Sequence, residues 1–182
     1  MMISSEHRLL IDESLQKIAA HEQKRAACAG ISTQESPALE VLRQSVIGQH
    51  LEHLAEIAEQ GLTMGRVEAK AMLKEVYQLL FAGSFQEYPL IPASFDNTPL
   101  GTLLYQARSR ILDLHDVINV TEAARKSGLS RTLLYLMAEV GVIHPLNMAN
   151  RLMVDREELD RLIEDRRQKL TEDPNKKAND NF

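Results

Sequence analysis

Cysteine is nearly missing from this sequence, since Cys28 is the one cysteine among 182 residues. A single cysteine has no partner for a disulfide within the chain, whereas small secreted domains commonly depend on such bonds. The cytoplasm keeps thiols reduced, so this cysteine content fits that compartment best. We therefore predict a cytoplasmic protein.

Long apolar runs are missing as well. No window approaches the roughly 18 consecutive uncharged apolar residues that a membrane-spanning helix requires. The N-terminal stretch MMISSEHRLLIDESL has acidic side chains early and lacks the apolar centre of a signal peptide. We therefore expect neither a membrane span nor a secretory signal, and no membrane partner.

A strong excess of positive charge is also lacking. The formal net charge is −5 at pH 7, with 21 Lys and Arg against 26 Asp and Glu. Residues 1–115 hold 10 basic and 14 acidic side chains, whereas residues 117–170 hold 9 and 8. A domain that binds nucleic acid tightly by itself usually has a clearer excess of Lys and Arg. The charge balance therefore counts against a strong nucleic-acid binder, although the C-terminal third is the least acidic part.

Recognisable catalytic and metal-binding motifs are absent from the sequence. It contains no glycine-rich phosphate loop, no activated serine and no paired carboxylates in a recognisable setting. His50 and His53 share one predicted helix with glutamates nearby, but a zinc site needs further ligands, so a polar helix face explains them better. Cys28, in AACAG, fits a small packed side chain better than a nucleophile. The sequence thus predicts no enzyme and no cofactor.

Helix-forming residues dominate what is present. Leu, Ala, Glu, Arg and Gln are abundant while tryptophan is absent, which favours helices. Apolar residues at i, i+3 and i+4 spacing predict four helices in the first part of the chain, at about 5–27, 37–60, 64–82 and 99–114.

Capping residues mark where three of these helices begin. Ser36 precedes Pro37, and Thr98 precedes Pro99, which are favourable pairs at a helix start. Thr63 is expected to cap the third helix. Residues 84–98 contain two prolines and several turn-forming residues, so this segment is the best candidate for a domain boundary, and the helix 99–114 could belong to either side of it.

Residues 120–141, VTEAARKSGLSRTLLYLMAEVG, have the pattern of two short helices joined at Gly128. Glycine costs roughly 1 kcal/mol relative to alanine inside a helix, but it adopts a positive φ without strain. Ala124, Gly128 and Leu134 have the spacing of a helix-turn-helix. The small residue lies where the helices cross, the glycine makes the turn, and the apolar residue fills the space between the helices.

Caps and a following β-wing support this interpretation. Thr121 is expected to cap the first short helix and Ser130 the second, and Gly141 is expected to end the second. The next residues predict a strand, a turn at 147–150, a return strand beginning at Arg151, and a last helix. Asp155 and Glu158 have the spacing of a capping box at the start of that helix.

The segment from Val117 to Ile163 resembles the winged helix-turn-helix of the MerR and excisionase superfamily. The matching features are the opening VTEAA, the turn SGLSR, the exit GVIHP, a basic wing residue in NR and the closing DREELDRLI. This resemblance implies DNA binding through the second helix and the wing, as a dimer or in tandem, without catalysis. The N-terminal region resembles no family that we can name.

The candidate DNA-binding residues lie on the second short helix and the wing, apart from Thr121 at the start of the first short helix. Arginine can bond guanine bidentately, and hydroxyl groups can hold phosphates. The candidates are Thr121, Ser130, Arg131, Thr132, Tyr135, Asn150 and Arg151.

We therefore predict a mainly α-helical protein whose N-terminal helical region is followed by a C-terminal winged helix-turn-helix with a small β-wing. Its parts are expected to be a self-association or partner-binding region at 1–98, a connecting helix at 99–116, the winged domain at 117–170 and a disordered tail at 171–182.

The expected function is a DNA-binding transcriptional regulator that acts as a repressor by occlusion. Its expected partner is double-stranded DNA, and the N-terminal helices would form a homodimer, bind a partner protein or bind a small effector. Two alternatives remain open. One is an excisionase-like architectural protein, and the other is a protein-interaction adaptor whose winged domain docks a larger complex.

Overall fold

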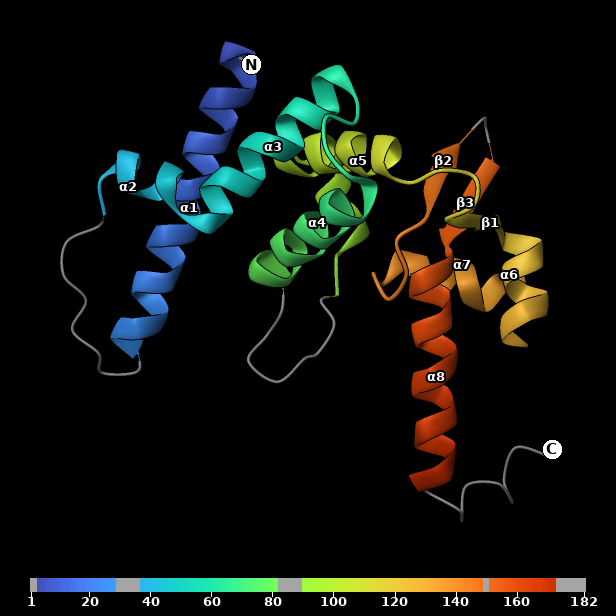
Figure 1. The fold of residues 1–182 in the computed structure, drawn as a ribbon. Helices are drawn as coiled ribbons and strands as arrows, with labels where there is room; N and C mark the ends of the chain where they lie inside the picture. The colour runs from blue at the N-terminus through green and yellow to red at the C-terminus, as the bar shows by residue number, and fades with distance from the viewer. Residues whose placement is uncertain (1–2, 29–36, 82–89, 149–150, 173–182) are drawn as a thin grey trace. The chain divides into compact units, whose positions relative to one another are not determined.

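The computed structural model describes residues 3–28, 37–81, 90–148 and 151–172 (Figure 1). The chain divides into two compact units, Met1–Ile111 and Leu112–Phe182. As the sequence predicts, it is mainly helical, with one small antiparallel sheet toward the C-terminus. Among the described residues, no helix has both the length and the apolar character needed to cross a bilayer.

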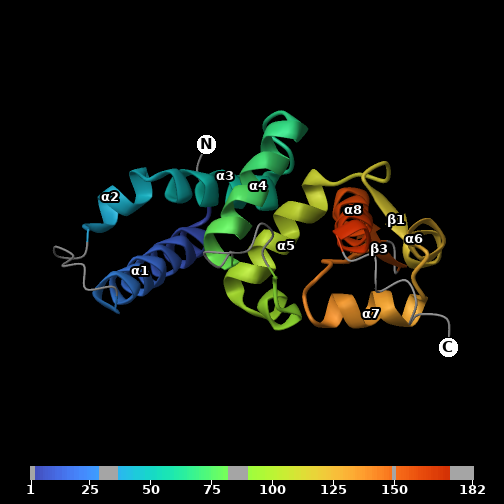
Figure 2. The ribbon, with the colours of Figure 1, turned by 90° about the horizontal axis from the view of Figure 1, so that it is seen from below.

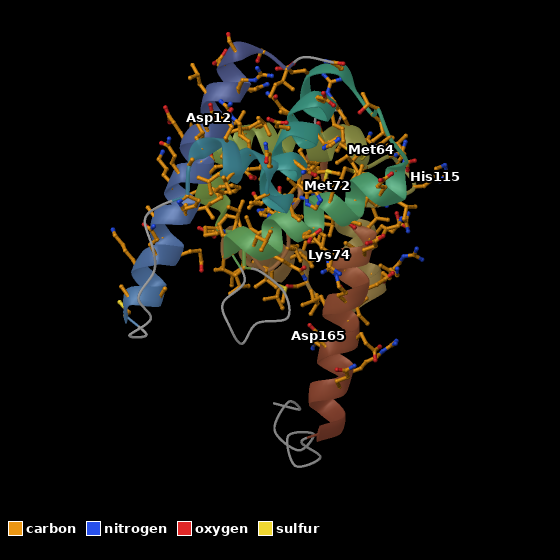
Figure 3. All side chains as sticks on the ribbon, turned by 60° about the vertical axis from the view of Figure 1, so that its left-hand side comes forward. Asp12, Met64, Met72, Lys74, His115 and Asp165 are labelled. Carbon is orange, nitrogen blue, oxygen red and sulfur yellow. The ribbon has the colours of Figure 1, made fainter. Side chains whose placement is uncertain are left out.

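The first unit consists of helices alone within its described residues. The α-helices are α1 (Ser5–Cys28), α2 (Leu39–Gln44), α3 (Val46–Gln60), α4 (Arg66–Phe81) and α5 (Pro99–Ile111), and a 3-10 helix, η1 (Ala93–Asn97), precedes α5. Their inner faces form one core in which α3 packs against both α4 and α5, and Met72 of α4 is among its buried residues (Figure 3). Its fully buried side chains include Ile11, Leu15, Leu51, Leu54, Ile57, Leu103, Leu104 and Ile111.

The second predicted helix, 37–60, is wrong in one respect, because it is broken at Ser45. Ser45 has an extended backbone, and its Oγ accepts a hydrogen bond from the Gly48 amide at 3.2 Å, so it caps α3. A Cβ on Gly48 would lie 2.5 Å from the carbonyl oxygen of Arg43, so glycine permits this sharp bend. The helix before the bend starts at Leu39 rather than at Pro37, and Ser36 lies outside the described residues.

The other two predicted caps have opposite outcomes. Thr98 is confirmed, because its Oγ1 accepts a hydrogen bond from the Gly101 amide at 3.0 Å. Thr63 is not at a helix start, because α4 begins at Arg66.

The predicted connecting helix, 99–116, is wrong in its last residue and in its role. Helix α5 ends at Ile111, and the boundary between the units follows it. Leu103, Leu104 and Ala107 of α5 are buried in the core of the first unit. Because this apolar face needs the first unit to cover it, α5 belongs to that unit, and the stretch before Thr98 is not a boundary. Residues 171–172 of the predicted tail continue the last helix, and 173–182 lie outside the described residues.

Two polar contacts attach α1 to its neighbours. Both carboxylate oxygens of Asp12, on α1 (Figure 3), accept hydrogen bonds from Arg43 at 2.7 and 2.6 Å. The carboxylate of Glu59, near the end of α3, accepts a hydrogen bond from the Ser4 amide at 2.9 Å and lies 2.6 Å from Nδ1 of His7. Hydrogen bonds from Ser4, and from His7 after it, lower the pKa of Glu59 below its ordinary value.

Acid is expected to remove the contribution of Glu59 to stability. Because the folded protein lowers the pKa of this carboxyl, the contribution is present above the ordinary glutamate pKa of about 4.3 and is lost as pH falls through the lower folded value. Glu59→Gln should therefore unfold at lower denaturant concentration than the wild type at pH 7, and the gap should narrow at pH 3. Urea titrations at both pH values measure this. If the two proteins differed in stability by the same amount at pH 7 and pH 3, the ionised form of Glu59 would not contribute to stability.

Candidate nucleic-acid interface

The second unit combines a helix-turn-helix with a small sheet. Its elements are β1 (Val117–Asn119), α6 (Val120–Ser127), α7 (Arg131–Glu139), β2 (Leu146–Met148), β3 (Arg151–Asp155) and α8 (Arg156–Glu172). The strand order is β1-β3-β2, and both pairs are antiparallel. Helix α6 contacts β1, β3 and α7, and α8 packs against α6 and β3 (Figure 2).

The turn between α6 and α7 confirms the roles predicted for Gly128 and Ser130. Gly128 follows the last residue of α6 with φ at +69°, in the left-handed region that favours glycine. A Cβ there would meet nothing within 4 Å, so the backbone conformation, not crowding, favours glycine. Ser130 then caps α7, because its Oγ accepts a hydrogen bond from the Leu133 amide at 3.1 Å.

Thr121 does not cap α6, contrary to the prediction. The cap is Asn119, whose Oδ1 accepts a hydrogen bond from the Glu122 amide at 2.9 Å. The helix starts earlier than expected because β1 leads directly into it at Val120. Thr121 lies in the first turn with an exposed side chain. An asparagine three residues before a glutamate was the available signal, since Asn is as good a cap as Ser or Asp.

The end of α7 has the predicted glycine. Gly141 has φ at +80°, and its amide bonds to the carbonyl oxygen of Ala138 at 3.2 Å. The Val142 amide reaches back to the carbonyl oxygen of Met137 at 2.8 Å. These two bonds form a Schellman motif, which stops the helix and turns the chain toward the wing.

The wing is formed by β2 and β3, with Met148 opposite Arg151. Arg151 begins β3 and is exposed, whereas Asn150 lies outside the described residues. Strand β1, which pairs with the other edge of β3, was not predicted. Three residues are too few to give a periodic signal, so this strand is defined by its partner rather than by its own sequence.

Two carboxylates at the start of α8 have different roles, since one caps this helix and the other bonds to the segment before the wing. Asp155 caps α8 as predicted, since its Oδ1 accepts a hydrogen bond from the Glu157 amide at 2.9 Å. Glu158, expected to complete a capping box, accepts a hydrogen bond from the amide of buried His144 at 2.8 Å. Because His144 lies between α7 and β2, this bond ties the approach to the wing to α8.

A separate apolar core holds the two helices and the sheet in place. Leu134 of α7 is 1% exposed, whereas its neighbour Leu133 is 37% exposed, so Leu134 is the residue that fills the space between the helices. Ala123 is fully buried, and Ala124 packs at the edge of the same core. The buried members are Ile118, Val120, Ala123, Leu129, Leu134, Ile143, Val154 and Leu159.

The outward surface of α7 has a polar edge, which consists of Arg131, Tyr135 and Glu139. These residues follow one another at i+4 spacing, which places them on one side of the helix. Ser130 caps the same end, and Thr132 lies beside Arg131 in the first turn; all of these side chains are exposed. The structure therefore brings four predicted site residues together on the first two turns of α7, whereas Thr121 and Arg151 lie on α6 and β3.

The outward surface of α7 also has an apolar edge, which consists of Leu133, Leu136 and Val140. These side chains recur at i, i+3 and i+7, so they too share one side of the helix. They are exposed by 37, 52 and 56%. Leu134 is the buried residue of α7, so these three apolar side chains form a stripe outside the core.

Some of the cationic side chains of this unit form ion pairs with its acidic side chains, and Arg131 forms none among the described residues. Nζ of Lys126 lies 2.6 Å from Asp160, and Arg156 lies 3.9 Å from Glu122, so acidic side chains of the same unit partly neutralise both. Arg131 is exposed and makes no hydrogen bond or ion pair within the described part of the chain. A guanidinium without an internal partner can turn toward an anionic ligand without first giving up a contact.

The first unit holds two other features that could suggest a site, the histidine pair on α3 and a groove beside α1. Nδ1 of His53 lies 2.7 Å from the carbonyl oxygen of Gln49, and Nδ1 of His50 lies 3.6 Å from Glu75, so the pair does not converge on one point. Within the described ranges, no three His, Cys, Asp or Glu side chains are grouped to hold a metal ion. An open groove of about 500 Å³ between α1 and the α2–α3 bend is lined mainly by apolar residues, including Leu15, Ile18 and Leu42.

The positions of α7 and the wing are thus fixed by the turn, the helix caps and the core of the second unit. Its main features are the left-handed turn before α7, Arg131 at the start of α7, which has no partner within the described ranges, and the two edges of the outward surface of α7. Comparison with known proteins found no matching family model, no matching curated protein and no matching solved structure.

Proposed function

We propose that this protein is a transcriptional regulator that binds double-stranded DNA through α7 and the wing, and that it represses by occlusion. The observation that carries this proposal is Arg131, an exposed guanidinium with no partner among the described residues, in the first turn of a helix that follows the turn glycine Gly128. The resemblance of the segment to the MerR and excisionase superfamily supports the same reading.

The proposed complex uses the N-terminal end of α7 in the major groove. This end carries the positive part of the helix dipole and unsatisfied amide groups, both of which favour phosphate. Arg131 would bond a guanine edge, and the hydroxyls of Ser130, Thr132 and Tyr135 would bond phosphates or bases. Arg151 and Asn150 of the wing, and Thr121 of α6, would contact the backbone. No chemical step and no cofactor is part of this proposal.

We also propose that the first unit brings two copies together. A single small winged domain contacts few base pairs, and two-fold pairing on a palindromic site raises the affinity. Exposed Val41 and Val46 stand on α2 and α3, near the apolar groove beside α1, so this unit has apolar surface available for association. Such pairing also explains how a domain with a modest basic balance could bind DNA.

Arg131→Ala is expected to weaken binding to a specific site by about ten- to a hundredfold. The reason is the loss of a bidentate contact to a base. The measurement is fluorescence anisotropy with the full chain and DNA fragments from around its own gene, repeated over a series of salt concentrations. Wild-type affinity should fall steeply with salt, because phosphate contacts release counterions.

The matched control is Arg8→Ala, which removes the same charge from an exposed position on α1 in the first unit. It should bind as the wild type does. No binding above background at low salt would reject the proposal and favour the protein-interaction adaptor. Tandem cooperative binding with a strong bend in the DNA would instead favour the excisionase-like role.

A further inference from the structure

The apolar edge of α7, defined above by Leu133, Leu136 and Val140, lies outside the core of the second unit. The core takes Leu134 from this helix, with Met137 and Ala138 at its margin. Leu136 points away from that side and is 52% exposed, and no described residue covers the rest of its surface. Leu136, one turn beyond Thr132, therefore offers an apolar contact to a ligand that has an apolar feature inside a polar surface.

Double-stranded DNA has one such feature in its major groove. The C5 methyl group of thymine is the apolar group that a base pair presents there, and the other edges are hydrogen-bond donors and acceptors. The methyl group of Thr132 lies one helical turn before Leu136, at i+4 spacing, so both offer apolar contact on the same side of α7. The polar edge beside them carries Arg131, whose preferred base is guanine.

We propose that Leu136, supported by Thr132, reads thymine methyl groups, so that α7 recognises a guanine and one or two thymines close together. This inference rests on the proposed function. Arg131 and Leu136 are separated by about 7.5 Å along the helix axis at 1.5 Å per residue. For a helix that lies along the groove, this corresponds to about two base pairs at 3.4 Å each. The guanine and thymine contacts therefore fall within one short half-site.

The choice of DNA over a protein partner follows from the neighbours of Leu136. An apolar protein surface over Leu136 would have to cover Arg131 as well, and a desolvated charge without a partner is costly. Glu139 is the last residue of α7, so it lies away from the N-terminal end that would enter the groove. DNA offers Arg131 both a base edge and phosphates, while Leu136 needs only a methyl group of the same groove. A free cation and an exposed leucine on adjacent sides of one helix fit this mixed surface.

Replacement of thymine by deoxyuridine tests this directly, because the two bases differ by the methyl group alone. The full chain is first used to select a duplex from a randomised library, and each thymine of the enriched duplex is then replaced in turn. Wild-type affinity should fall about fourfold at one or two positions, which is the effect expected for one buried methyl group. Leu136→Ala should bind the thymine duplex more weakly by a similar factor and should not respond to deoxyuridine at those positions.

Leu79→Ala is the control, since Leu79 is 55% exposed on α4 of the first unit and should keep the full response to deoxyuridine. Leucine and alanine are both good helix formers, so α7 should stay folded in the Leu136 variant, and circular dichroism checks this. If a duplex is enriched but deoxyuridine has no effect at any position, or if Leu136→Ala keeps the response, this inference is overturned and the proposed function stands. If no duplex is enriched at low salt, the proposed function itself fails, and the apolar edge is left as a surface for a protein.

Discussion

Gly101→Ala is expected to lower the free energy of unfolding of the first unit by about 3 kcal/mol, the upper part of the range for overpacking a core. Gly101 is buried in α5, where the chain of η1 passes directly over it. A Cβ on this residue would overlap the carbonyl oxygen of Phe95 and would lie 3.0 Å from Cα of Asp96. These are backbone atoms, so a rotamer change cannot relieve the overlap.

The segment that would have to move is held at both sides of the contact. Oγ1 of Thr98 accepts a hydrogen bond from the Gly101 amide at 3.0 Å, and Oγ1 of Thr102 donates to the carbonyl oxygen of Asp96 at 3.0 Å. Moving η1 away from α5 would break these bonds and would disturb the ring of Phe95, which packs against Phe81 with centroids 4.7 Å apart. The strain therefore spreads through the end of the first unit.

Urea denaturation of the full chain measures the loss, and hydrogen exchange of peptides from residues 99–111 assigns it to the first unit. Gly65→Ala is the matched control, because a Cβ there would meet only the Glu68 side chain, at 3.8 Å or more. The control should lose less than about 1 kcal/mol, because Gly65 directly precedes α4 and alanine is a poorer N-cap than glycine. Equal losses in the two variants would contradict a tight contact between η1 and α5.

Leu134→Ala is expected to destabilise the second unit by about 2–5 kcal/mol, the range for removing a fully buried leucine. Leu134 is 1% exposed and packs between α6, α7 and the sheet. The unit has one small core, so a cavity at this point removes a large share of its stability. Because the position of α7 depends on this contact, the DNA binding that we propose should be lost together with the fold.

Leu133→Ala provides the comparison, since it removes the same atoms from the adjacent position, where 37% of the residue is exposed. This variant should lose less than half as much stability. Hydrogen exchange of peptides from α6, α7 and β3 separates the second unit from the first. If the two variants were equally stable, Leu134 would not fill the space between the helices, and the helix-turn-helix packing would be wrong.

The features that could be predicted from the sequence are mostly local. Ser130 and Gly141 act through bonds to residues three positions away, and Gly128 acts through its own left-handed backbone, so a short stretch of sequence contains all that these signals need. The same holds for Thr98 and Asp155, whose caps involve residues two or three positions further on. For this reason the order of helix, turn, helix, wing and helix was predictable.

The errors arise where the partner is distant or where two local signals compete. Thr121 and Asn119 are both good caps, and β1 decides between them by ending at Asn119. Glu158 suited a local capping box, but the amide of His144 reaches it from another part of the chain. The sequence alone could not decide which residue caps α6 or which amide bonds to Glu158, because each choice is favourable by itself.

The sequence by itself determined the helical class, the turn at Gly128, the caps at Thr98, Ser130 and Asp155, and the wing after Gly141. Only the tertiary structure decided that α5 belongs to the first unit, that β1 completes the sheet, and that α7 presents a polar and an apolar edge. The physical reason is that caps and turns satisfy backbone groups of neighbouring residues, whereas burial depends on which distant surface covers a side chain. Leu133, Leu134 and Leu136 are chemically identical, and only packing made one of them core and left the others on the surface.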